Sequence, residues 1–97
     1  MEEKKFSIVF GHSAQREIVE LEIQDALRLA RDIKTYLGRS PFPFGKTRIK
    51  KLTGFHPPLY RLRSGDYRVY YRIIFREIVI LAITHKKDSE KHLRRLR

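Results

Sequence analysis

The sequence predicts a small single α+β domain over residues 1–97: a mainly antiparallel sheet of about four strands, an N-terminal helical region on one face, and a short C-terminal helix. Three observations support this class. Short β-branched and aromatic segments flank a long segment of helical periodicity. Two later segments alternate polar and apolar residues around a Ser-Gly dipeptide, as a hairpin does. A chain of 97 residues suffices for one modest core and not for two.

The first predicted strand covers residues 5–10, which are short, β-branched and aromatic in character. From about residue 13 to residue 37, apolar side chains recur at three- and four-residue steps, the spacing of one helix face. We expect Ser13 to be the N-cap and Gly38 to lie just past the C-terminus. The pattern leaves open whether this is one helix or two with a bend near residues 21–23.

Residues 40–58 are predicted to be mostly irregular, because prolines and glycines interrupt them. Basic residues are interleaved there with Phe42, Phe44 and Phe55, and such mixtures suit single-stranded nucleic acid, where bases stack and phosphates pair with cations. In a small domain, loop phenylalanines also close the edge of a core, and that alternative stays open. The candidate RNA-binding residues of this segment are Lys46, Arg48, Lys50 and Lys51.

The alternation of residues 59–73 aims three arginines at one face of the predicted sheet. Successive strand side chains point to opposite faces, so Arg61 and Arg63 share a face. A two-residue turn at Ser64-Gly65 pairs Arg61 with Arg68. Like charges directly opposite one another cost a few tenths to about 1 kcal/mol, so stability alone does not select this arrangement. A solvated basic face is the alternative to a site for an anionic ligand.

The aromatic residues of the same two strands divide between the faces. We expect Tyr60, Tyr67 and Val69 to form core opposite the arginines, packed against the helices. Tyr70 shares the arginine face, where it could either stack on RNA or cover the sheet edge.

The last predicted strand is the apolar run of residues 78–83, which is typical of a strand buried on both faces. If Arg76 and Glu77 make the preceding turn, Arg68 falls opposite His85. Arg61, Arg68 and His85 then form a row across three neighbouring strands, with Lys86 and Lys87 leaving from its end.

A short basic helix is predicted from residue 88 to residue 97. Asp88 or Ser89 is the expected cap, and Leu93 and Leu96 are the expected apolar contacts. Its basic side chains again favour an anion.

Composition limits the possible functions. Lys and Arg number 22 against 11 Asp and Glu, a formal charge of +11, which favours phosphate backbones, anionic membranes or an acidic protein partner. The lack of cysteine excludes a disulfide framework, cysteine-ligated zinc and a thiol nucleophile. No run approaches the ~20 apolar residues of a membrane span, and no signal peptide is visible. We therefore expect a cytoplasmic protein without membrane association.

No metal or cofactor site is readable in the sequence. The histidines lack the close spacing of metal ligands, and neither a glycine-rich phosphate loop nor a Ser/His/Asp arrangement is present. We therefore expect no metal and no small-molecule cofactor. The histidines are His12, His56, His85 and His92.

Four short segments carry a recognisable pattern: residues 51–54 (Lys-Leu-Thr-Gly), 59–63 (Leu-Tyr-Arg-Leu-Arg), 65–68 (Gly-Asp-Tyr-Arg) and 85–88 (His-Lys-Lys-Asp). With the order of predicted elements, they resemble the RelE/ParE toxin superfamily of bacterial toxin-antitoxin modules, closely over about residues 52–88. The resemblance implies the RelE-like fold and an acidic antitoxin partner. In the RelE branch it implies metal-independent cleavage of mRNA in the ribosomal A site, leaving a 2′,3′-cyclic phosphate. In the ParE branch it implies inhibition of DNA gyrase without RNA cleavage.

Such cleavage needs a base for the 2′-hydroxyl, an acid for the leaving 5′-oxygen and cations for the phosphate oxygens. Arginine supplies the cations well and does not deprotonate at neutral pH. RelE-like sequences often carry lysines where this chain has Arg61 and Arg63, so no lysine base is expected there. His85 is the candidate for proton transfer, although a strand-end hydrogen bond would also satisfy it. The candidate catalytic residues are Arg61, Arg63, Arg68, His85 and Lys87.

RelE-like enzymes also carry an aromatic residue near the C-terminus that stacks on a substrate base. By spacing, the matching position here is His92 or Leu93, and imidazole can stack. The candidate RNA-binding residues after the last strand are Lys86, His92, Arg94 and Arg95. The favoured function is a ribosome-dependent endoribonuclease restrained by an antitoxin. The alternatives are a gyrase-directed toxin and a housekeeping RNA-binding domain.

Overall fold

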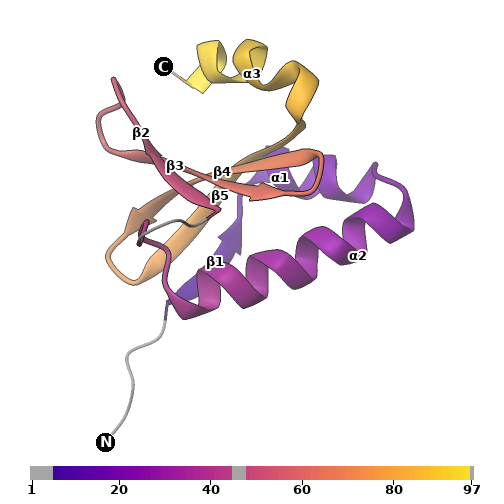
Figure 1. Ribbon diagram of the computed structural model, residues 1–97, viewed down its shortest axis with the longest axis horizontal. Coiled ribbons are helices and arrows are strands. Elements are labelled where there is room, and N and C mark those ends of the chain that lie inside the picture. The colour runs from indigo at the N-terminus through magenta and orange to yellow at the C-terminus, as the bar shows by residue number, and fades with distance from the viewer. Residues whose placement is uncertain (1–5, 45–47, 97) are drawn as a thin grey trace, which may run out of the picture.

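The structure, a computed structural model, describes residues 6–44 and 48–96. They form a five-stranded sheet in the order β1-β5-β4-β3-β2, with helices on both faces (Figure 1). This confirms the predicted α+β class. The strands are β1 (Ser7–Phe10), β2 (Ile49–Leu52), β3 (Leu59–Ser64), β4 (Tyr67–Ile74) and β5 (Glu77–His85). The helices are α1 (His12–Val19), α2 (Ile23–Asp32), the π-helical turn η1 (Ile33–Leu37), the 3₁₀ turn η2 (Lys86–Asp88) and α3 (Ser89–Leu96).

The sheet is antiparallel except where β1 runs parallel to β5. It has five strands rather than about four, because residues 49–52 pair with β3 inside the segment predicted to be mostly irregular. Only Ile49 is buried in this strand, whereas Lys50 and Lys51 are exposed. Lysine is common on edge strands, where it discourages pairing with other chains, and it hides the alternation that marks a strand in sequence.

The N-terminal helical region consists of two helices separated at residues 20–22, which agrees with the bent alternative. The predicted N-cap is wrong, because α1 follows Gly11 rather than Ser13. The Gly11 amide donates to the Ile80 carbonyl at 2.9 Å, and a Cβ at Gly11 would lie 3.1 Å from that oxygen. The start of α1 is therefore set by this close approach to β5. Gly38 caps η1 in ordinary right-handed backbone (φ −67°), close to the predicted end.

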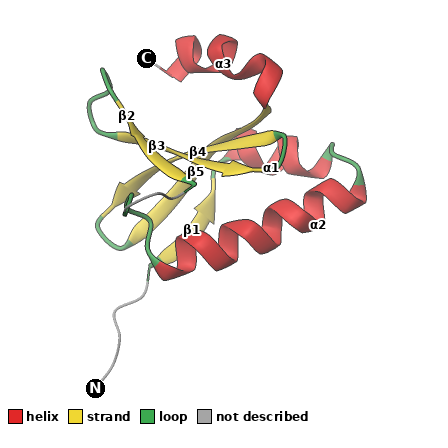
Figure 2. Ribbon diagram, in the orientation of Figure 1, coloured by secondary structure: helices red, strands yellow, loops and turns green. Residues whose placement is uncertain are grey.

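Helices lie on both faces of the sheet (Figure 2), and the core has two parts, one on each face. Under α1 and α2, the buried residues include Leu29, Ile33, Tyr60, Leu62, Val69, Tyr71, Ile78 and Ile80, and Tyr67 packs against them. Under α3 they are Phe55, Leu59, Tyr70 and Ala82, with Leu93 and Leu96 packed on them. The predicted core positions Tyr60, Tyr67, Val69, Leu93 and Leu96 are confirmed, and β5 is buried on both faces as expected. The apolar stripe of the helical region is only partly core, because Ile23 and Leu27 are exposed.

Tyr70 is 1 % exposed and belongs to the core under α3, so it covers the sheet and is not free to stack on RNA. Phe55 is buried in the same cluster, as expected of a loop phenylalanine that closes the edge of a core. Within the described ranges, no helix is long and apolar enough to cross a membrane.

Candidate nucleic-acid interface

Basic side chains gather on the sheet face that α3 partly covers. Arg63 lies directly opposite Arg68, and Arg61 lies opposite Tyr70 and Lys50. The predicted pairing of Arg61 with Arg68 is therefore wrong by two residues. A two-residue shift keeps every side chain on its face, so the prediction that the three arginines share a face is confirmed. We call this surface the arginine face; it comprises Lys50, Arg61, Arg63, Arg68 and Arg72.

The register of the β3–β4 hairpin is set by contacts with α2. The turn residues are Gly65 and Asp66, with Gly65 at φ +58°. Ser64 is the last residue of β3, and its hydroxyl donates to Asp32 Oδ2 at 2.7 Å. Arg28 Nη1 lies 2.7 Å from where a Cβ on Gly65 would stand, but the end of a flexible arginine side chain can move aside, so it is the positive φ that favours glycine here. These long-range contacts are not visible in the local sequence.

Arg72 was missed by the sequence analysis, although period-2 alternation from Arg68 through Tyr70 leads to it. The Nε atoms of Arg61 and Arg72 are buried and have no hydrogen-bond partner among the described residues. Buried donors are normally paired, so these two Nε–H groups are exceptions.

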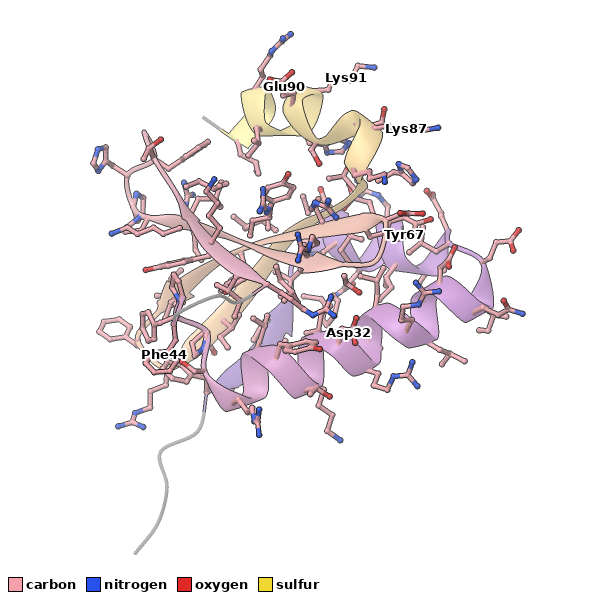
Figure 3. The ribbon with its side chains drawn as sticks, viewed as in Figure 1. Asp32, Phe44, Tyr67, Lys87, Glu90 and Lys91 are labelled. Carbon is pink, nitrogen blue, oxygen red and sulfur yellow. The ribbon has the colours of Figure 1, made fainter. Side chains whose placement is uncertain are left out.

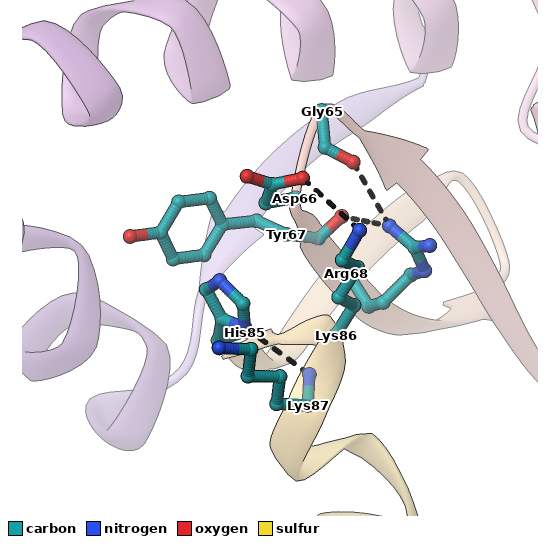
Figure 4. A network of polar contacts seen from close by, with 7 residues as sticks. All are labelled: Gly65, Asp66, Tyr67, Arg68, His85, Lys86 and Lys87. Carbon is teal, nitrogen blue, oxygen red and sulfur yellow. Dashed lines mark hydrogen bonds and ion pairs between the residues drawn. The ribbon is translucent and has the colours of Figure 1, made fainter.

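Arg68 is fixed at the turn end of the arginine face. Its Nη1 donates to the carbonyls of Gly65 (3.1 Å) and Tyr67 (3.0 Å), as Figure 4 shows. Burial lowers the pKa of the Arg68 guanidinium below its ordinary value, and the charges of Arg61 and Arg63 lower it further. A guanidinium has five N–H donors, so most of those on Arg68 remain for a ligand.

His85 does not join the arginine face. The pairing is Tyr67 with His85 and Arg68 with Thr84, so the predicted row of Arg61, Arg68 and His85 is wrong. The turn before β5 is Phe75-Arg76 rather than Arg76-Glu77. This difference alone shifts the register by two residues, which would leave each side chain on its predicted face. An irregularity between Tyr70 and Tyr71 adds a one-residue shift, and such a shift reverses the faces.

The His85 ring lies edge-on against Tyr67, with 5.5 Å between ring centroids. His85 is also the N-cap of η2, and its Nδ1 accepts a hydrogen bond from the Lys87 amide at 3.1 Å. The Lys86 amide donates to the Asp66 carbonyl (2.8 Å), and Lys86 Nζ lies 3.4 Å from Asp66 Oδ1. Figure 4 shows Lys86 and Lys87 beside the turn that carries Arg68. The start of η2 is thus bonded to the β3–β4 turn through Lys86 and Asp66.

The other predicted RNA-binding residues are spread over several elements. Arg48 is exposed beside Tyr36, and Lys51 pairs with Tyr60 and so faces away from the arginines. Lys46 lies outside the described residues, and so does the side chain of Arg95. On α3, Arg94 is exposed and His92 is half-buried, whereas Leu93 packs into the core. Of the two positions considered for base stacking, only His92 is therefore free of the core.

Metal ligands do not converge in this part of the molecule. Across residues 6–44 and 48–96, no group of three His, Cys, Asp or Glu side chains is placed to hold a metal ion.

This chain is similar in sequence and fold to known proteins. The family model described as ParE toxin of type II toxin-antitoxin system, parDE, matches residues 6–90. The RelE–RelB complex from Pyrococcus horikoshii OT3 is 26% identical, with a TM-score of 0.67, over 84% of this chain and 94% of that chain. The RelBE2 complex from Mycobacterium tuberculosis is 24% identical, with a TM-score of 0.72, over 84% and 98%.

The isolated RelE toxin of E. coli is 21% identical, with a TM-score of 0.66, over 94% of this chain and 99% of that chain. No curated protein matches the sequence. Because the family model covers most of the chain and the solved neighbours share its fold, the chain belongs to the RelE/ParE superfamily of type II toxin-antitoxin toxins.

Proposed function

We propose that this protein is a ribosome-dependent endoribonuclease that cuts mRNA in the ribosomal A site. The arginine face carries the proposal. Arg61, Arg63 and Arg68 lie together on adjacent strands, and none of them forms an ion pair with a carboxylate in the described part of the chain. Guanidinium groups bind phosphate oxygens through paired donors and stabilise the charge that develops on them during cleavage.

In the proposed reaction, the 2′-oxygen bonds to the adjacent phosphorus while the bond from phosphorus to the 5′-oxygen breaks. The 2′-hydroxyl gives up a proton, the leaving oxygen gains one, and the products are a 2′,3′-cyclic phosphate and a 5′-hydroxyl. Arg61, Arg63, Arg68 and Lys87 hold the phosphate. Lys50, Arg48, Lys86, His92 and Arg94 are the described candidates for contacts along the strand.

The position of His85 bears on whether it transfers a proton or positions a neighbouring residue. Proton transfer requires hydrogen-bond reach to a reacting oxygen, whereas the contacts of His85 are Tyr67 and the Lys87 amide. The geometry favours a positioning role, in which the imidazole holds Lys87 beside the β3–β4 hairpin that carries the arginines. Proton transfer by His85 stays a prediction that the same variants test.

Asparagine at position 85 keeps a side-chain acceptor at the N-cap and removes the titratable group. If His85 positions Lys87, we expect His85→Asn to retain most of the cleavage rate and the pH profile, and His85→Ala to cut several-fold more slowly. The measurement is the cleavage rate from pH 5.5 to 8.5 on ribosome-bound mRNA. A loss of about 100-fold or more in both variants would establish His85 as the proton-transfer group instead.

An acidic antitoxin is the proposed protein partner. The structural neighbours from P. horikoshii and M. tuberculosis are complexes of a toxin with its antitoxin, and a formal charge of +11 favours an acidic binding partner. Because the proposed target is the ribosome, we expect the protein to act in the cytoplasm.

The second candidate function is gyrase inhibition, which the match to the ParE family model favours. Primer extension on a defined mRNA in a reconstituted translation reaction, with and without ribosomes, separates the two. A-site cuts that require ribosomes support the endoribonuclease. Intact mRNA, together with inhibition of gyrase supercoiling by the same preparation, would support the ParE-like function.

A further inference from the structure

A pocket of about 540 Å³ opens beside Arg63, where the end of the helical region, the following loop, the start of β2 and the end of β3 meet. Its size falls within the range of small-ligand sites. The residues that matter for its chemistry are Tyr36, Arg39, Phe42, Phe44, Arg48 and Arg63.

The aromatic walls of the pocket differ in how firmly they are held. Phe42 makes edge contacts with Phe6 and Tyr60, at centroid distances of 6.2 Å and 6.1 Å. Phe44 is 83 % exposed, and Figure 3 shows it projecting on the side of the molecule away from Lys87. An exposed phenylalanine contributes little to a core, so the Phe44 ring at the mouth of the pocket is available to a ligand with an apolar or flat surface.

The charged groups of the pocket are all cationic. Arg39, Arg48 and Arg63 line it, and none of its lining residues among the described ones is acidic. The Arg48 guanidinium lies 5.2 Å from the centroid of the Tyr36 ring, a cation–π contact that holds it at the wall. Arg63 belongs to both the pocket and the arginine face, where it lies opposite Arg68. A ligand in the pocket that contacts Arg63 therefore shares this residue with the proposed phosphate site.

We infer that this pocket binds one nucleobase of the single-stranded RNA whose phosphate lies on the arginine face. The inference rests on the proposed endoribonuclease function. The base stacks on Phe44 and the Arg48 guanidinium, and Arg63 contacts the phosphate that joins this nucleotide to the next. The aromatic rings beside the arginines favour RNA over an acidic peptide, because each nucleotide carries a flat base next to its phosphate.

Binding of fluorescein-labelled oligo(A) and oligo(U) decamers, measured by fluorescence anisotropy, tests this inference. Stacking of one base predicts about 10-fold weaker binding by Phe44→Ala. Phe75→Ala is the matched control, because Phe75 is 95 % exposed at the β4–β5 turn, outside the pocket, and we expect it to bind like wild type. Ultraviolet cross-linking followed by peptide mapping should place the cross-link in residues 36–44.

Equal RNA affinity in Phe44→Ala and Phe75→Ala, with no cross-link in residues 36–44, would overturn the inference. The inference would also be overturned if Phe44→Ala bound a decapeptide of alternating glutamate and leucine more weakly than wild type but bound RNA equally well. Primer extension distinguishes failure of the base-binding pocket from failure of the proposed endoribonuclease function. Ribosome-dependent cuts by wild type with unchanged RNA affinity in Phe44→Ala would refute only the pocket. Loss of RNA affinity in Phe44→Ala without any cleavage by wild type would refute only the nuclease.

Discussion

Replacing Arg68 by methionine is expected to slow mRNA cleavage by about 100- to 1,000-fold, the usual effect of removing one donor that stabilises a developing negative charge. Methionine keeps much of the side-chain volume and removes the charge. Stability should change by no more than about 1 kcal/mol, because relief of repulsion opposes the loss of two hydrogen bonds to carbonyls. Repulsion is expected because Arg68 lies opposite Arg63; the pKa of Arg68 is lowered first by burial and then by the charges of Arg61 and Arg63.

The measurements for this prediction are the rate of A-site cleavage and the midpoint of urea unfolding. Arg76→Met is the matched control, because Arg76 is an exposed residue in the β4–β5 turn and we expect both quantities to match wild type. Arg68→Lys should recover only part of the rate, since lysine keeps the charge without the planar pair of donors. A full cleavage rate in Arg68→Met would remove the arginine face from the proposed mechanism.

The features of this fold that the sequence predicts are those that depend on local periodicity. Alternation placed Arg61, Arg63 and Arg68 on one face, and a hairpin slip of two residues left that assignment intact. The apolar run at residues 78–83 was correctly predicted to be a strand buried on both faces.

The features that local pattern does not predict depend on contacts between distant segments. The end of β3 is bonded to Asp32 of α2 through Ser64, and the start of α1 lies against the Ile80 carbonyl of β5. Because of the irregularity between Tyr70 and Tyr71, His85 lies on the opposite face from the arginines, and no residue type near it predicts a bulge. The pocket has the same character, because its arginines come from three separate segments that only the folded sheet brings together.

Replacing Tyr71 by alanine is expected to cost about 3–5 kcal/mol of the free energy of unfolding. Tyr71 is 0 % exposed and stacks on Tyr60, with 5.6 Å between ring centroids and 19° between ring planes. Its hydroxyl donates to the Pro41 carbonyl at 2.7 Å, and burial raises its pKa above the ordinary value. Small domains have about 5–15 kcal/mol in total, so this variant should be partly or largely unfolded at 37 °C.

Tyr71→Phe separates the ring from the hydroxyl. It keeps the stacking and removes only the bond to Pro41, so we expect a loss of about 1–2 kcal/mol in urea unfolding followed by circular dichroism. Tyr36→Phe is the control, because Tyr36 is only half-buried and its hydroxyl has no hydrogen bond among those found in the described residues. Wild-type stability in Tyr71→Phe would show that the Pro41 bond contributes nothing.

The same hydroxyl links the core to the pocket. Pro41 directly precedes Phe42 in the loop that forms one wall, so loss of the Tyr71 bond frees that wall while the arginine face keeps its own contacts. We therefore expect Tyr71→Phe to bind single-stranded RNA a few-fold more weakly and to keep the cleavage rate at saturating ribosome-bound mRNA. A fall in that rate without a fall in RNA affinity would contradict this division, because the loop would then act on the phosphate site rather than on the base.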